Sequence, residues 1–224
     1  MAPSADNQSP RLFYHTVDKS VPSSSLTEDG GSWAGAVWSH VRRVSVAGFD
    51  MPEIIYYVAA SIDGYIATPD GGVDWLAPFE GGLEDYGYSA FYDSVDAILL
   101  GSRTYEQVLT FGDWPYPGKP SWVFSAREFP VEPEVTFTHA SPVEIAADLD
   151  ARGTRRAWLV GGAALASSFR NVGLITEYII SVMPVVLGGG IPLFAKPGPR
   201  EKLTLVSEMR YEDGVVQLTY QPDA

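Results

Sequence analysis

Short apolar runs, each followed by a glycine or a hydroxyl residue, constrain the fold of this chain more than any other feature of its sequence. Such runs occupy residues 97–100, 121–124 and 158–160. A short strand that is apolar throughout is typical of a sheet covered on both faces. Because helix-like segments follow the first and third runs, we predict an α/β fold in which helices flank a central, mainly parallel mixed sheet.

Local signals predict the other elements of this sheet and its helices. Residues 54–60 are β-branched and aromatic, as in a strand, and Asp63-Gly64 follows as a turn. The run Ser141-Pro142-Val143-Glu144 combines a hydroxyl cap, a proline at the first helical position and a glutamate three residues after the cap. It predicts a helix that ends near Gly153. Further helices are predicted at 83–94, 102–109 and 163–171, and further strands at 177–186, 203–208 and 215–220, the last after a hairpin turn at 213–214.

The first fifty residues differ in composition from the rest. Residues 1–50 are rich in Pro, Ser, Gly and Asp without a sustained apolar period, which predicts a largely disordered N-terminal extension before one domain at 51–224. Residues 38–49 alternate in a way that allows a short strand or a membrane-facing patch, with chance apolarity as the alternative. Because organised sequence begins at Met51, a further hypothesis is that the natural protein starts there. N-terminal mass analysis from the native host tests it, and a natural start at Met1 would contradict it.

Composition excludes several classes of function. The 224 residues carry 15 basic and 28 acidic side chains, a formal net charge of −13 without a basic stripe, so nucleic acid is not an expected partner. There is no cysteine, which excludes disulfides, thiolate catalysis and cysteine-based zinc sites, and we predict no metal. The sequence has neither a long apolar run nor a secretory signal pattern, so we expect no membrane partner and a cytoplasmic location.

Three predicted strand ends carry groups that suit a phosphate. Gly161-Gly162 leads directly into a helix, where backbone N–H groups can donate to an anion, although turn geometry alone can also require these glycines. Arg103 follows Gly101-Ser102 at a second strand end, with an ordinary exposed arginine as the alternative. Ser125 and Arg127 follow the third. Ligands bind at the carboxyl ends of parallel strands, so the three motifs together indicate a dinucleotide.

The same motifs carry a family resemblance. In order and spacing, SIDGYIA, GSRTYE, VFSAR, WLVGGAAL and EYIISVMPVVLGGGIPLF resemble the stand-alone relatives of the reductase domain of riboflavin biosynthesis and, more distantly, dihydrofolate reductase. The resemblance covers residues 52–222 and implies a dihydrofolate-reductase-like three-layer fold, NADPH as cofactor and a homodimer, for which the apolar C-terminal strands could supply the contact. The zinc deaminase often fused to such reductases is not expected, because cysteine is absent and there are only 3 histidines.

The resemblance also implies roles for individual residues. Those expected to contact the cofactor are Ala60 and Ile66 at the nicotinamide, Gly101, Ser102, Arg103 and Thr104 at the phosphates, Ser125 and Arg127 at the 2′-phosphate of the adenosine, and Gly161, Gly162, Ala163, Ala164 and Leu165 at the pyrophosphate. In dihydrofolate reductases that last turn contains a strained Gly-Gly peptide, which Gly161-Gly162 is expected to repeat.

The proton donor is the least defined of these roles. Rough register with dihydrofolate reductases indicates Asp85 or Glu84, and Asp74 is an alternative because it precedes Trp75 in the presumed substrate-side loop. Asp63 is a further alternative, and a solvated surface role competes for each acid. The Trp-x-x-Pro-x-(Asp/Glu) pattern of folate enzymes is absent, so the resemblance does not extend to folate as substrate.

Three hypotheses of function remain at this point. The first is an NADPH-dependent reductase that transfers hydride to a small heteroaromatic substrate, pterin-like or pyrimidine-like. The second narrows this to a 5-amino-6-(5-phosphoribosylamino)uracil reductase of riboflavin synthesis, which needs a second phosphate site. The third is a non-catalytic dinucleotide-binding dimeric scaffold, favoured by the lack of an unmistakable acid.

Overall fold

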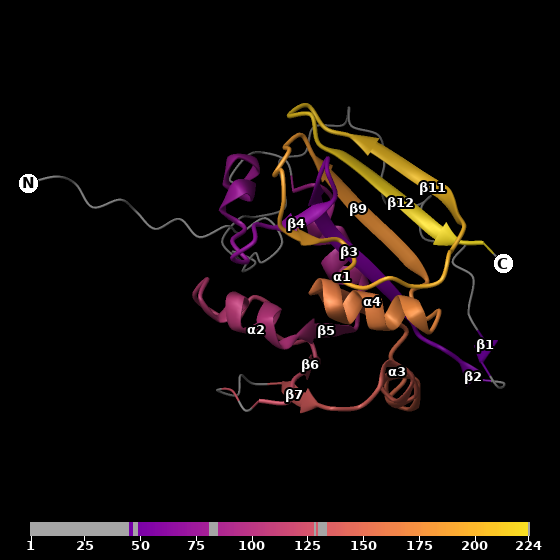
Figure 1. Ribbon diagram of the computed structural model, residues 1–224. Helices are drawn as coiled ribbons and strands as arrows, with labels where there is room; N and C mark the ends of the chain where they lie inside the picture. The colour runs from indigo at the N-terminus through magenta and orange to yellow at the C-terminus, as the bar shows by residue number, and fades with distance from the viewer. Residues whose placement is uncertain (1–44, 47–48, 81–84, 128, 130–133, 224) are drawn as a thin grey trace, which may run out of the picture.

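The computed structural model describes residues 45–46, 49–80, 85–127, 129 and 134–223 (Figure 1). The strands of the main sheet are β3 (Glu53–Ser61), β5 (Ala97–Gly101), β6 (Ser121–Phe124), β7 (Val135–Thr138), β8 (Arg156–Gly161), β9 (Glu177–Met183), β11 (Leu203–Arg210) and β12 (Val216–Pro222). They form one eight-stranded sheet in the order β11-β12-β9-β3-β8-β5-β6-β7. Neighbours from β9 to β7 are parallel, and only the β9–β12 and β12–β11 pairs are antiparallel.

Helices cover both faces of this sheet. They are α1 (Tyr88–Ser94), α2 (Ser102–Leu109), α3 (Pro142–Ala151), α4 (Ala163–Asn171) and the 3-10 helix η1 (Asp74–Phe79). Alternate residues of β3 belong to two separate apolar cores: Tyr57 lies in the core that α1 and α2 complete, and Tyr56 in the core that α3 and α4 complete. The predicted three-layer, dihydrofolate-reductase-like α/β fold with a mainly parallel mixed sheet is therefore confirmed.

The predicted elements recur with changed ends. The Ser141 hydroxyl accepts from the Glu144 backbone N–H, and Glu144 reaches back to Ser141, so α3 has the predicted capping box. Strand β9 ends at Met183, short of the predicted residue 186, because Pro184 has no N–H to continue the ladder. Helix α1 begins only at Tyr88, and residues 83 and 84 of its predicted first turn lie outside the described residues.

Several short elements were not predicted. Strands β4 (Tyr65–Ala67) and β10 (Ile191–Pro192) pair antiparallel. Gly190, the residue before β10, lies so close to β4 that a Cβ on it would be 2.1 Å from the Ala67 carbonyl oxygen. Strands β1 (Ser45–Val46) and β2 (Phe49–Asp50) also pair antiparallel within the extension predicted to be largely disordered, and β1 lies in residues 38–49, for which a short strand was one of the alternatives. Residues 1–44 and 47–48 of that extension lie outside the described residues.

Trp158 occupies the centre of the core between the sheet and α1. It is fully buried, and its indole Nε1–H donates to the Tyr57 carbonyl on β3 over 3.1 Å. The edges of three rings meet it, those of Phe91 at 5.4 Å, Tyr116 at 5.5 Å and Tyr88 at 5.8 Å between centroids. Edge-to-face contacts of this kind stabilise the fold beyond the burial of the rings. Through these contacts the Trp158 side chain connects β8 with β3, α1 and the segment before β6.

Replacement of this indole should destabilise the whole domain. We expect Trp158→Ala to lower the free energy of unfolding by about 3–5 kcal/mol, because it opens a large cavity and leaves the Tyr57 carbonyl without its donor. Urea denaturation measures the change. Val143→Ala, at a valine that is 49% exposed, is the control and should change stability by less than about 0.5 kcal/mol. A loss below about 1 kcal/mol for Trp158→Ala would show that the core does not depend on the indole.

Candidate functional site

A large cavity lies at the carboxyl ends of the central parallel strands. Its volume is about 1260 Å³, and its walls come from β3, the segment after β4, the start of α2, the end of β8 and the start of α4. Cavities that hold small molecules usually measure about 300 to 1,000 Å³. The cavity is therefore large enough for an extended ligand, and it lies at the edge of the sheet where parallel strands commonly bind one.

Two strand ends approach each other closely beside this cavity. A Cβ on Gly101 at the end of β5 would lie 3.3 Å from the backbone nitrogen of Gly162. A Cβ on Gly162 would lie equally close, 3.3 Å, to the Thr104 hydroxyl oxygen. The Gly161–Gly162 peptide bond is cis, and Gly161 has a φ of +133°, a conformation open to glycine and rarely to other residues. Glycine at these positions lets the backbone itself form the wall.

The two helices that begin here have no side chain at their N-cap position. Gly101 is the N-cap of α2 and Gly162 that of α4, whereas α3, away from the cavity, has its Ser141–Glu144 capping box. The first N–H groups of a helix have no partner within the helix, and its N-terminus carries a partial positive charge. Two helix starts in one cavity wall therefore suit an anion, as the glycine motifs indicated.

Most of the residues predicted to contact a cofactor meet in this cavity. Those that line it are Ile66, Gly101, Ser102, Arg103, Thr104, Gly162, Ala163, Ala164 and Leu165. The others, Ala60, Ser125, Arg127 and Gly161, do not line it. In β3 the neighbouring residues Val58 and Ala59 face the cavity, while Ala60 is buried within the sheet. The cavity thus joins two of the three motifs directly.

The third motif lies just outside and is linked to the cavity by an ion pair. Ser125 is buried, and its hydroxyl bonds to the backbone of Arg127 in a tight turn. The Arg127 guanidinium lies 2.8 Å from the carboxylate of Glu106, which does line the cavity, and stacks over Phe129 with 5.0 Å to the ring centroid. Arg103, by contrast, makes no ion pair with any described residue. The neighbouring carboxylate therefore neutralises one predicted phosphate ligand and leaves the other available.

The two predicted proton donors among the described residues, Asp85 and Asp74, do not line the cavity. Asp85 accepts hydrogen bonds from the backbone N–H groups of Gly87 over 2.8 Å and Ser89 over 3.3 Å, so it caps the start of α1. Asp74 is exposed at the start of η1, between the cavity-lining Val73 and Leu76. Glu84 lies outside the described residues.

A fourth acid considered as a proton donor, Asp63, has a structural role. Its carboxylate accepts from the Ser61 hydroxyl and from the backbone of Leu187 and Gly188, and these hydrogen bonds, that from Ser61 first, lower its pKa. Asp63 thereby ties the turn after β3 to the glycine-rich segment before β10. An acid held ionised in this way is a poor proton donor near neutral pH.

Four further residues of the cavity were not singled out from the sequence. Asp70 accepts from the Thr68 hydroxyl, which is the first cause of its lowered pKa. Gln107 donates to the Gly71 carbonyl over 2.8 Å and so links α2 to the loop that carries Asp70. Glu106 follows Arg103 by three positions, about one helical turn, so the two side chains lie on the same face of α2. This spacing was the only sequence signal that Glu106 belongs to the cavity. Tyr57 is signalled only by its place on an apolar strand.

Tyr57 lines the cavity and is a buried residue whose hydroxyl is bonded to groups that do not line it. Its hydroxyl donates to the Tyr86 carbonyl over 3.3 Å and accepts from the Gln217 side chain over 3.1 Å. Burial raises the pKa of Tyr57, so the phenol stays protonated. Trp158, Val73 and Leu76 also line the cavity, and apolar lining of this kind suits a flat, largely apolar ring.

Among the described residues, no group of three or more metal-ligating side chains comes together. Nor is any helix there long and apolar enough to cross a membrane.

The fold and the cavity together define a reductase-type α/β domain with the dihydrofolate-reductase-like architecture. Residues 117–217 match the family described as the RibD C-terminal domain. The uncharacterized protein YwjB of Bacillus subtilis (strain 168) is 40% identical over 170 residues, which are 75% of this chain and 97% of that protein. The chain belongs to the RibD C-terminal domain family, as a stand-alone member.

Two further relatives carry names from riboflavin synthesis. The crystal structure of a putative riboflavin biosynthesis protein from Shewanella sp. PV-4 is 33% identical, with a TM-score of 0.71 over 77% of this chain and 99% of that one. The riboflavin biosynthesis protein RibD of Mycobacterium tuberculosis (strain ATCC 25618 / H37Rv) is 29% identical over 169 residues, 69% of this chain but 47% of that protein. The chain therefore corresponds to about half of a full-length RibD.

Proposed function

We propose that this protein is an NADPH-dependent reductase that transfers hydride to a small heteroaromatic substrate, pterin-like or pyrimidine-like. The observation that carries the proposal is the meeting of two glycine-capped helix starts and the Arg103 guanidinium in one cavity of about 1260 Å³. Membership of the RibD C-terminal domain family supports a reductase of the riboflavin-pathway type.

The residues of the cavity fit a dinucleotide. A Cβ on Gly101 would press on the backbone nitrogen of Gly162, and a Cβ on Gly162 would press on the Thr104 hydroxyl, so glycine at both positions keeps the backbone N–H groups accessible to phosphate. We assign the phosphates to residues 101–104 and 162–165, the 2′-phosphate to Arg127 with Ser125 shaping its turn, and the nicotinamide to Ile66 and the end of β3 near Ala60. When bound, NADPH supplies the hydride.

The apolar part of the cavity lining is assigned to the substrate. Val73 and Leu76 would contact a flat ring and exclude water, and the buried Trp158 and Tyr57 would hold this part of the wall in place. Hydrogen bonding holds Asp70 ionised and Asp85 caps α1, so a bound water molecule is the proton source that we favour, with Asp74 and Glu84 as the remaining protein candidates.

Arginine substitutions test the cofactor assignment. Arg103→Ala should weaken binding of NADPH and NADH alike, about tenfold or more, because a hydrogen bond to a charged group contributes about 1.5–3 kcal/mol. Arg127→Ala should weaken NADPH and leave NADH unchanged, since only NADPH carries the 2′-phosphate. Isothermal titration calorimetry measures both, with Arg152→Ala, at an arginine paired with Asp148 on α3, as the control. Equal affinity of the wild type for the two cofactors would show that the 2′-phosphate assignment is wrong.

The Glu106–Arg127 ion pair generates an opposite expectation. Glu106→Gln should tighten NADPH about twofold to fivefold and leave NADH unchanged, because it removes a negative charge beside the assigned 2′-phosphate and frees the guanidinium. The gain should shrink at high salt, which screens exposed charges. Glu208→Gln on the exposed strand β11 is the matched control. Weaker NADPH binding by Glu106→Gln would mean that Glu106 orients Arg127 for the cofactor.

A substrate panel separates the proposal from its rivals. Pterins, pyrimidines and the phosphoribosylated aminouracil are compared as acceptors, with NADPH oxidation followed at its absorbance band. We expect turnover of an unphosphorylated ring, because Arg103 is the only basic side chain among the described residues that line the cavity. Turnover of the phosphoribosylated compound alone would favour the riboflavin-pathway uracil reductase, which the names of the relatives support. Tight NADPH binding without turnover of any acceptor would support the non-catalytic scaffold.

We further propose a cytoplasmic homodimer that pairs through β11. This strand is at the edge of the sheet, and Leu205 and Val206 are 44% and 45% exposed on it. Unpaired edge strands with apolar side chains readily pair with another chain. Analytical ultracentrifugation tests this, and a monomer at all concentrations would contradict it.

A further inference from the structure

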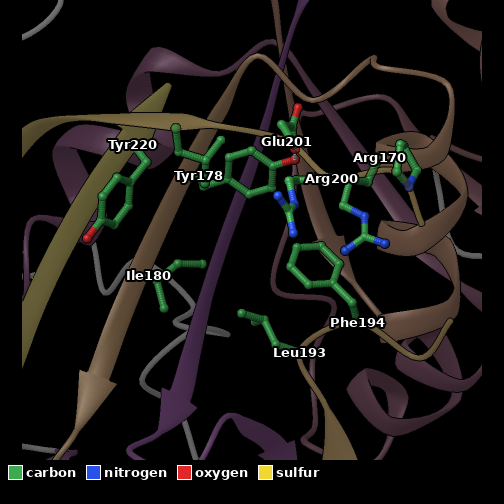
Figure 2. Close-up of a pocket in the computed structure, with 10 residues that line it drawn as sticks. Arg170, Tyr178, Ile180, Leu193, Phe194, Arg200, Glu201 and Tyr220 are labelled. Atoms are coloured by element: carbon green, nitrogen blue, oxygen red, sulfur yellow. Dashed lines mark hydrogen bonds between the residues drawn. The ribbon is translucent and has the colours of Figure 1, made fainter. Parts of the chain in front are cut away.

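A second cavity lies at the opposite end of α4 from the Gly162 turn. Its volume is about 390 Å³, and it is enclosed by β9, β12, the end of α4 and the segment from Leu193 to β11 (Figure 2). In Figure 1 the strands that border it, β9 and β12, are orange to yellow and belong to the other end of the sheet from β6 and β7. No step of the proposed reaction uses it.

Three aromatic rings form much of its wall. Tyr178 and Phe194 meet edge to face, with centroids 6.1 Å apart, and Tyr220 lies on the other side of Tyr178 in Figure 2. Ile180 and Leu193 complete the apolar part of the wall. A wall of aromatic and aliphatic side chains favours a flat, apolar ring.

A guanidinium group lies against this wall. Arg170, in the last turn of α4, places its guanidinium carbon 4.6 Å from the centroid of the Phe194 ring. One of its amino groups donates to the Lys196 carbonyl over 3.4 Å, while its Nε–H is buried with no acceptor among the described residues. A buried donor without a partner is costly, and a bound acceptor would remove that cost.

A second guanidinium reaches the same space. Figure 2 shows Arg200 and Arg170 with their guanidinium groups on the same side of Phe194, beside Tyr178. The one carboxylate of the wall, that of Glu201, accepts the Tyr178 hydroxyl over 2.6 Å. The charged groups that line this cavity therefore sum to a positive charge, on a chain whose formal net charge is −13. Paired guanidinium groups recognise carboxylate in preference to neutral ligands.

The two cavities share a wall but remain separate. Ile191 and Ala195 line the large cavity, while Leu193 and Phe194, from the same segment, line the small one. The Tyr56 hydroxyl donates to the Leu193 carbonyl over 3.0 Å and holds this segment on the sheet. No lining residue is common to the two cavities, so a ligand of the small one has its own contacts.

From this geometry we infer that the small cavity is a binding site for an aromatic carboxylate. The ring lies against Phe194 and Tyr178, and the carboxylate accepts hydrogen bonds from Arg170 and Arg200. The site is independent of the reductase proposal, because none of its residues contributes to the large cavity. A volume of about 390 Å³ suits one or two fused rings and excludes a dinucleotide.

Isothermal titration calorimetry of the full chain with 2-naphthoate tests this inference. We expect a Kd of about a millimolar or tighter. Arg170→Met and Arg200→Met keep an unbranched apolar stem and remove the charge, and each should weaken binding about tenfold or more. Arg152→Met is the matched control at another helix C-terminus, and it should bind as the wild type does. Thermal melts of all variants check that the fold is kept.

Three outcomes would overturn the inference. The first is absence of heat with 2-naphthoate, which is also the result expected if a second copy of the chain fills the cavity. The second is equal binding of the neutral 2-naphthamide, which would show an apolar hollow without anion recognition. The third is loss of binding in Arg103→Met with retention in Arg170→Met and Arg200→Met, which would put the ligand in the large cavity. The reductase proposal would survive each of them.

Discussion

The indole of Trp158 fills the space between β8, β3 and α1, and its N–H donates to the carbonyl of Tyr57 on the neighbouring strand. The same side chain lines the large cavity. Burial of an aromatic side chain contributes strongly to stability, while a cavity requires that the surrounding groups not collapse into it. One rigid ring, held by a hydrogen bond and by three other rings, meets both requirements. Trp158 is therefore both a core residue and part of the cavity wall.

Backbone, rather than side chains, forms another part of the cavity wall. At Gly101 and Gly162 the ends of β5 and β8 approach to within the distance of one missing Cβ, and two helices begin there with their first N–H groups uncapped. A site made of N–H groups binds an anion by direction and partial charge and needs few basic residues. This explains how a chain with a net charge of −13 can suit a phosphorylated cofactor.

Electrostatics divides the arginines of the molecule into distinct roles. Arg127 is paired with Glu106 and stacked on Phe129, so its charge is held in place and partly neutralised. Arg170 lies over Phe194 with one donor unpaired in a cavity that has an excess of positive charge. An exposed ion pair such as Arg127–Glu106 contributes little to stability, whereas a buried donor without a partner, as in Arg170, is costly. The sequence around the two arginines does not indicate this difference.

What the sequence determined by itself is local. Apolar runs, the capping box at Ser141 and the glycines after β5 and β8 depend on residues adjacent in the chain. They correctly predicted the α/β class and most elements, and two of the motifs they indicated line the large cavity. The family resemblance added the three-layer architecture. The predicted ends of elements were less accurate where a single residue stops the element, as Pro184 stops β9.

Only the tertiary structure decided which groups face one another across the sheet. Asp63 has the residue type of a proton donor, yet its carboxylate accepts from the backbone N–H groups of Leu187 and Gly188, more than a hundred positions along the chain. Glu106 becomes the partner of Arg127, and Arg170 becomes a neighbour of Arg200, through contacts between residues more than twenty positions apart. Such pairings follow from strand order and register, which depend on how the whole core packs and have no local signal in the chain.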